Sequence, residues 1–156
     1  MRGVALVLCA ALLQAQSTSD PAARWKPIEF LLGKWTAQGG GSSTGQGAGD
    51  FSFELDVNKQ IVTRRNFAAY TSGPEAGTRH DDLMILFSED AGKSLKAIYF
   101  DSEGHVIHYD VRSPAPNVAV FEGSGYRLTY RFEGKALAGK FEVGGKTYLE
   151  WTSVRK

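Results

Sequence analysis

Hydrophobic and polar residues alternate with a period of two along most of this chain, from Gly33 onwards. The run 51–57 shows the pattern most clearly, because apolar side chains at every second position alternate with Ser52, Glu54 and Asp56. Such alternation is typical of a strand with one buried and one solvated face. Further strands are expected at 33–38, 60–70, 82–87, 95–100, 105–112, 118–122, 126–132, 137–143 and 147–154.

The connectors between these strands are short and mostly contain glycine, as at 102–104 and 144–145. Short connectors make consecutive strands pair antiparallel, and so many sequential strands most simply close on themselves, which leaves no exposed edge. The sequence therefore predicts an all-β fold, an antiparallel up-and-down barrel of about ten strands, with a two-sheet meander sandwich as the alternative. We expect the segment 39–49, GGGSSTGQGAG, to be a flexible loop, and 71–79 to lie at a barrel mouth.

The N-terminal residues follow a different pattern. Residues 1–16 combine Arg2 with a short apolar run and small or polar residues, which predicts a cleaved signal peptide and a periplasmic or secreted protein. Residues 17–32 predict one or two short helical turns, since Asp20 suits a cap and Pro21 a first helical position. The barrel domain is then expected at 33–156.

Composition narrows the functional class. Removal of the signal peptide removes the only cysteine, so no disulfide holds the domain, which suits a bacterial periplasm. The chain carries 18 basic and 17 acidic side chains with mixed signs. This balance favours neither nucleic acid nor an anionic membrane as partner, and no later segment predicts a membrane anchor.

Trp35 in the first strand and Arg155 at the end of the last strand are expected to meet, because a closed barrel makes those strands neighbours. Arg155 over the Trp35 indole would close that end of the barrel by packing and cation–π contact. The pattern PIEFLLGKW at 27–35, a glycine-rich segment and ten strands ending in a basic residue resemble lipocalin-like, calycin-type barrels. The chain more closely resembles an uncharacterised bacterial family of small lipocalin-like domains, related in architecture to nitrobindin-type haem barrels and fatty-acid-binding proteins.

The resemblance implies a central cavity for a hydrophobic or amphipathic small molecule. Nitrobindin-type members bind haem through a histidine near the C-terminal strand, and the matching segment 148–155 contains none. Haem is therefore disfavoured, and no cofactor is predicted.

The side-chain pattern of two strands also predicts an internal binding cavity. Two strand faces, one with Tyr126, Leu128 and Tyr130 and one with Leu149 and Trp151, are expected to line the interior. The alternative is that they only fill the core. A ten-stranded barrel is wider than the eight-stranded barrels that side chains just fill, which favours a cavity.

Arg64 and Arg65 are adjacent, so one of them faces inward, and the face of Arg65 carries Phe67 and Ile61. A buried arginine needs a carboxylate partner, from Glu150 or from a ligand. Our hypothesis is that Arg65 and a tyrosine hold the polar head of an amphipathic acid; the alternative places Arg65 at a wet rim. The candidate ligand-binding residues are Arg65, Phe67, Tyr99, Tyr130 and Trp151.

Metal and catalytic sites are not predicted. His105 and His108 fall on opposite faces of one strand, and His80 is expected to be a solvated strand entry. Ser124 lies between two glycines and is expected in a hairpin turn, without a hydrolase motif. The sequence thus predicts an exported barrel that binds a small apolar or amphipathic molecule. A hydrolase or isomerase on the same barrel, marked by a buried histidine–carboxylate pair, and a structural or protein-binding β domain are the alternatives.

Overall fold

The computed structural model describes residues 20–42 and 45–156, so the expected signal peptide at 1–16 lies outside the described residues. Ten strands follow one N-terminal helix. The strands are β1 (Gly33–Ser42), β2 (Gly45–Asp56), β3 (Ile61–Tyr70), β4 (Arg79–Glu89), β5 (Ser94–Asp101), β6 (Val106–Ala115), β7 (Val118–Gly123), β8 (Tyr126–Glu133), β9 (Ala136–Val143) and β10 (Lys146–Arg155).

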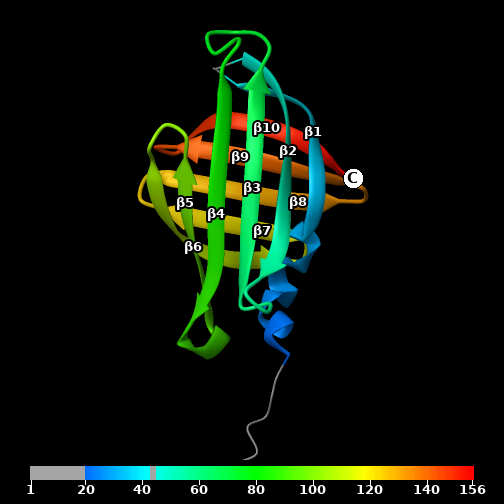
Figure 1. Cartoon of the computed structure of the whole chain (residues 1–156), viewed down its shortest axis with the longest axis vertical. Helices are drawn as coiled ribbons and strands as arrows, with labels where there is room; N and C mark the ends of the chain where they lie inside the picture. Colours follow the sequence, from blue (N-terminus) through cyan, green and yellow to red (C-terminus); the bar gives the residue numbers. More distant parts are fainter. Residues whose placement is uncertain (1–19, 43–44) are drawn as a thin grey trace, which may run out of the picture.

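Every strand pairs antiparallel with its sequence neighbours, and β1 pairs with β10 to close the barrel (Figure 1). The predicted all-β, ten-stranded barrel with a short N-terminal helical segment is confirmed. Closure pairs every strand on both sides, so the sheet has no free edge. Among the described residues, no helix is long and apolar enough to cross a membrane.

The glycine-rich segment 39–49 differs from the expected loop. Its described residues continue β1 to Ser42 and begin β2 at Gly45, and Gly41 pairs with Gln46. The neighbouring strands supply the reason, because β10 and β3 hydrogen-bond to this segment and offset its weak strand propensity. Glycine also suits the packing, since a Cβ on Gly49 would lie 2.0 Å from the carbonyl oxygen of Phe67.

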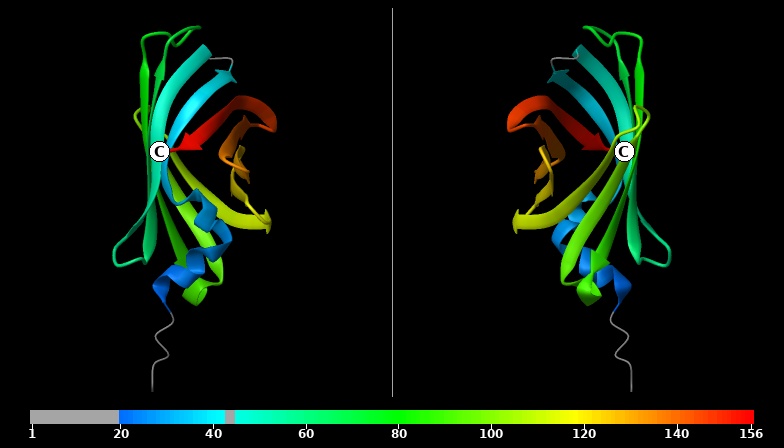
Figure 2. Two further views of the ribbon diagram at one scale, coloured as in Figure 1. Left: turned by 90° about the vertical axis from the view of Figure 1, so that its right-hand side faces the viewer. Right: turned by 90° about the vertical axis from the view of Figure 1, so that its left-hand side faces the viewer.

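The helix η1 (Pro21–Leu31) is a 3₁₀ helix that lies under one end of the barrel (Figure 2). Asp20 caps it by accepting a hydrogen bond from the Ala22 amide at 3.0 Å. Trp25, Ile28 and Leu31 are spaced by three residues, and a helix with three residues per turn places them on one face. All three are buried in the barrel core, so η1 closes this end.

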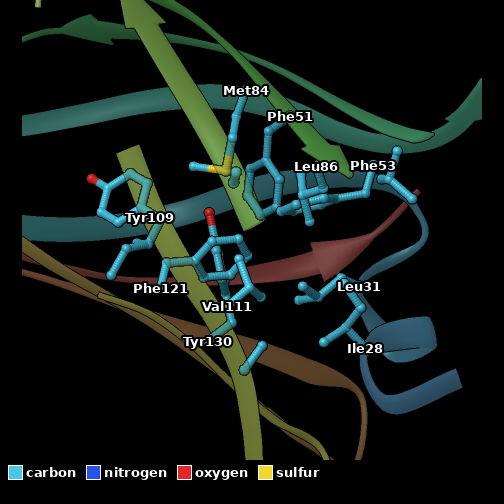
Figure 3. Close-up of a cluster of buried hydrophobic side chains, with 14 of the residues drawn as sticks. Ile28, Leu31, Phe51, Phe53, Met84, Leu86, Tyr109, Val111, Phe121 and Tyr130 are labelled. Carbon is cyan, nitrogen blue, oxygen red and sulfur yellow. The ribbon is translucent and has the colours of Figure 1, made fainter. Parts of the chain in front are cut away.

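The core occupies the part of the barrel next to η1. Figure 3 shows Ile28 and Leu31 of the helix facing Phe53, Leu86 and strand side chains around Tyr130. Tyr130 is fully buried, and its ring makes edge-on contacts with neighbouring aromatic rings, at 5.6 Å between centroids for Phe53. The core therefore fills this half of the interior.

The seam between β1 and β10 brings the first and last strands together. Trp35 pairs with Arg155 in the register of these strands, and the guanidinium carbon lies 4.4 Å from the indole centroid. Arg155 also donates hydrogen bonds to the carbonyl oxygens of Leu32 and Phe30, the latter at 3.1 Å. The contact thus joins the end of η1, the first strand and the last strand.

Candidate functional site

A cavity of about 470 Å³ opens in the barrel beyond the core. Its lining includes Glu75 and Thr78 in the connection between β3 and β4, at the end of the barrel away from η1 (Figure 1). Glu103 and His105, between β5 and β6, also border it. The size falls in the range of sites for small molecules, about 300 to 1,000 Å³.

One wall of the cavity is largely apolar and comes from β8, β9 and β10. Tyr126 and Phe141 stack there with ring centroids 6.1 Å apart, next to Leu128 and Trp151. Trp151 lies over the backbone of Gly139, where an added Cβ would sit 2.1 Å from the indole ring. Glycine at this position therefore allows the indole to lie flat against the sheet.

The opposite wall, from β3 and β4, carries a buried ion pair. Arg64 and Asp82 form a salt bridge with side-chain exposures of 6% and 4%. Asn66 donates a second hydrogen bond to the Asp82 carboxylate at 2.8 Å. Burial alone would lower the pKa of Arg64, but the charge of Asp82 and the interactions with Tyr130 and Tyr99 together outweigh it and keep this pKa above its usual range. Arg64 therefore stays charged and is already neutralised by Asp82.

Two tyrosines lie beside this pair and remain protonated. Burial raises the pKa of the Tyr99 hydroxyl, and the charge of Asp82 adds to the shift. Burial also raises the pKa of Tyr130, against the opposing charge of Arg64. Both hydroxyls are thus hydrogen-bonding groups rather than charges.

His80, at the start of β4, connects the ion pair to the mouth of the cavity. Its Nε2 lies 3.1 Å from the Tyr99 hydroxyl and 3.4 Å from Oδ2 of Asp82. Its Nδ1 lies 2.8 Å from Oε2 of Glu103. The hydrogen bond with Asp82 raises the pKa of His80, and burial opposes this shift without cancelling it.

Asp101 lies at the end of β5 and is held by the turn that follows. Its Oδ1 accepts hydrogen bonds from the amides of Glu103 at 3.1 Å and His105 at 2.8 Å. Its Oδ2 lies 2.9 Å from Nδ1 of His105. Burial alone would raise the pKa of Asp101, but these contacts with His105 lower it below its usual value.

The summed charge of the cavity is negative. One arginine lines it against four carboxylates, those of Glu75, Asp82, Asp101 and Glu103. With neutral histidines the described lining therefore carries an excess of three negative charges. This excess disfavours an anionic ligand and favours a neutral or cationic one.

The structure places the five predicted ligand-binding residues in three different environments. Tyr99 and Trp151 line the cavity, and Tyr130 lies in the core below it. Arg65 is exposed and lines a groove on the outer surface. Phe67 packs under Arg79 in the same groove, 4.5 Å from ring centroid to guanidinium, and also borders the cavity.

The inward orientation predicted for Arg65 was wrong, because Arg64 is the arginine that faces inward. The apolar residues Ile61 and Phe67 made the outer face of β3 look like the buried one. The position of the turn at 58–59 predicts the inward-facing arginine correctly. A hairpin centred there pairs Arg64 with Phe53, and paired residues face the same side.

His80 is a second residue that sequence reasoning missed. It was expected to be a solvated strand entry, whereas it is partly buried between Tyr99, Asp82 and Glu103. The alternation of Asp82, Met84 and Leu86, all buried, extends back along β4 to His80 and could have revealed its face. Ser124 is exposed in the turn between β7 and β8.

No protein-family model matches this chain, and no curated protein is similar to it in sequence. The assignment of function therefore rests on the chemistry of the cavity.

Proposed function

We propose that this protein is an exported, calycin-like barrel that binds a small amphipathic molecule with a neutral or basic polar end. The observation that carries the proposal is the cavity of about 470 Å³ with one apolar and one polar wall. Ten consecutive antiparallel strands above a short N-terminal helix support the lipocalin-like relationship. Export to the periplasm or the medium rests on the signal-like residues 1–16.

The apolar body of the ligand lies against Tyr126, Leu128 and Trp151, where its burial supplies most of the affinity. The polar end faces Tyr99 and His80 on the opposite wall. The four lining carboxylates disfavour the amphipathic acid expected from the sequence, because Asp82 already neutralises Arg64. A hydroxyl or amine end group therefore fits this wall better than a carboxylate.

A titration with Nile red, a neutral polarity-sensitive dye, tests the proposal. Ala68 lines the cavity, so Ala68→Phe fills part of it and is expected to weaken dye binding at least tenfold. Ala69→Phe is the matched control, since Ala69 is the next residue on β3 and faces the other side. Equal dye binding by both variants would contradict the proposal.

Displacement of the dye by three twelve-carbon compounds tests the polar end. We expect dodecylamine and dodecanol to displace Nile red at lower concentrations than dodecanoate does. The reason is the excess of carboxylates over Arg64 in the cavity lining. Tighter binding of dodecanoate would overturn the assignment of a neutral or basic head.

A proton-transfer enzyme, such as an isomerase, is the second candidate. It is favoured by the contacts of His80 with the Asp82 carboxylate and the Tyr99 hydroxyl inside the cavity. In that reading His80 is the general base and Tyr99 donates a hydrogen bond to a developing oxyanion. Faster exchange of the α-protons of cyclohexanone with D₂O in wild type than in His80→Gln, followed by NMR, would support it; equal rates would exclude this role for His80.

The third alternative is a structural or protein-binding β domain. Such a domain is expected to have an interior filled by side chains. The cavity weighs against this alternative.

A further inference from the structure

The mouth of the cavity gathers three side chains with metal-binding atoms, which we call the mouth cluster: His80, Asp101 and Glu103. One ligand atom from each lies within 4.8 Å of the other two. They come from the start of β4, the end of β5 and the turn after β5.

We propose that the mouth cluster binds one divalent transition-metal ion, with Zn²⁺ as the reference ion. One imidazole nitrogen and two carboxylate oxygens form a three-ligand set that leaves a coordination position open, as in catalytic zinc sites. That open position faces the cavity, which the three residues border. The inference goes beyond the proposed ligand, because it needs no molecule in the cavity.

His80 is held between two carboxylates. The carboxylate of Asp82, with a side-chain exposure of 4%, lies 3.4 Å from Nε2 of His80. Oε2 of Glu103 lies 2.8 Å from Nδ1, on the other side of the ring. If a cation replaces the proton between Nδ1 and Glu103, Asp82 remains as the acceptor for the Nε2 proton and keeps the ring in place. A carboxylate that orients a metal-binding histidine in this way is a common feature of zinc sites.

His80 and Glu103 meet at the short distance of 2.8 Å between Nδ1 and Oε2. Each of these two atoms can offer a lone pair to the other. Two facing lone pairs repel unless a proton or a cation lies between them. At low pH a proton fills this place, and at higher pH a metal ion can fill it.

The mouth cluster contains two negatively charged carboxylates. Asp82 is balanced by Arg64, but Asp101 and Glu103 have no arginine or lysine partner among the ion pairs of the described residues. A divalent cation would neutralise both carboxylates. His105, 2.9 Å from Oδ2 of Asp101, holds that carboxylate in place and would act as an outer partner of the site.

Calorimetric titration of the purified, tag-free protein with ZnCl₂ tests the proposal. We expect one Zn²⁺ per chain, with an affinity that rises with pH because the metal displaces a proton from His80. His80→Ala and Glu103→Gln are expected to weaken binding by more than roughly 100-fold, and His105→Ala by about 10- to 100-fold, as for an outer partner. Replacement of Zn²⁺ by Co²⁺ is expected to give visible absorption bands in wild type and none in His80→Ala.

His108→Ala is the matched control, since His108 is exposed on β6 and lies outside the mouth cluster. It is expected to bind Zn²⁺ like wild type. Glu103 is an exposed side chain in a turn, so Glu103→Gln keeps the test valid if His80→Ala fails to fold. Absence of Zn²⁺ binding in wild type, or equal loss in His108→Ala, would overturn the site.

One further variant separates the test of metal binding from the test of ligand binding in the cavity. Trp151→Ala removes part of the apolar wall on β10, a strand that is not adjacent to β4 or β5 in the sheet, so it is expected to weaken Nile red binding and to keep Zn²⁺ binding. Loss of both in this variant would show that no independent metal site exists.

Discussion

Arg64 and Asp82 form an ion pair inside the barrel, on neighbouring strands β3 and β4. Arg64 also lies over the ring of Phe51, 5.5 Å from its centroid, so the guanidinium packs against the aromatic core. The pair thus stands at the boundary between the core and the cavity, and it determines which charges a ligand meets.

Removal of one member of this pair is expected to be costly. Arg64→Met leaves the Asp82 carboxylate buried without its cation, which should lower the free energy of unfolding by about 3–5 kcal/mol. The double variant Arg64→Met, Asp82→Leu is expected to be more stable than Arg64→Met alone, because no buried charge remains. Urea unfolding followed by circular dichroism measures both, and a double variant less stable than the single one would contradict this account.

The contact of Arg155 with Trp35 and the end of η1 is expected to stabilise the barrel closure. Arg155→Ala removes the cation–π contact and the hydrogen bonds to Leu32 and Phe30, and should cost about 1–3 kcal/mol. Arg155→Lys keeps the charge but loses the planar group that makes these contacts together, so it should recover little.

Hydrogen exchange locates this effect. Arg155→Ala is expected to speed exchange of the Leu32 amide, which bonds to the Glu29 carbonyl at the end of η1, more than exchange in β6. A uniform change over the whole chain would argue against a local role of Arg155.

Stability is expected to depend on the protonation of His80. Its pKa is raised in the folded state by the hydrogen bond with Asp82, above the ordinary value of about 6.5. Charged His80 therefore contributes stability that is fully present below about pH 6.5 and is lost as the pH rises through the folded-state pKa. In metal-free buffer with a chelator, His80→Gln should remove this part of the pH dependence, and His108→Gln should keep it.

NMR titration of the imidazole protons gives the direct check. The resonance of His80 is expected to titrate above the value of a model histidine. A lower midpoint would contradict the contacts with Asp82 and Glu103.

Strand alternation and short turns were enough to predict the barrel, because each signal is local. The ten observed strands lie within a few residues of the predicted ones, except around the glycine-rich segment. There, pairing with β3 and β10 decides the structure, and no local propensity of glycine reports on that pairing.

The candidate site was harder to predict, because it depends on which face of each strand points inward. A shift of one residue in the expected register of β3 points Arg65 into the barrel in place of Arg64. The sequence then predicts an unpaired cation in the cavity, where the structure has an ion pair. His80 lies about twenty residues before Asp101 and Glu103 in the sequence, and it meets them only through the pairing of β4 with β5. Such a cluster follows from the pairing of strands and not from any short motif.

Native mass spectrometry of the protein purified from its own host tests the central claim, that the cavity holds a small molecule. The account predicts an added mass on wild type and on Ala69→Phe that is absent from Ala68→Phe, whose new side chain occupies the cavity. The same unliganded mass for all three proteins, or the same added mass on all three, would contradict it.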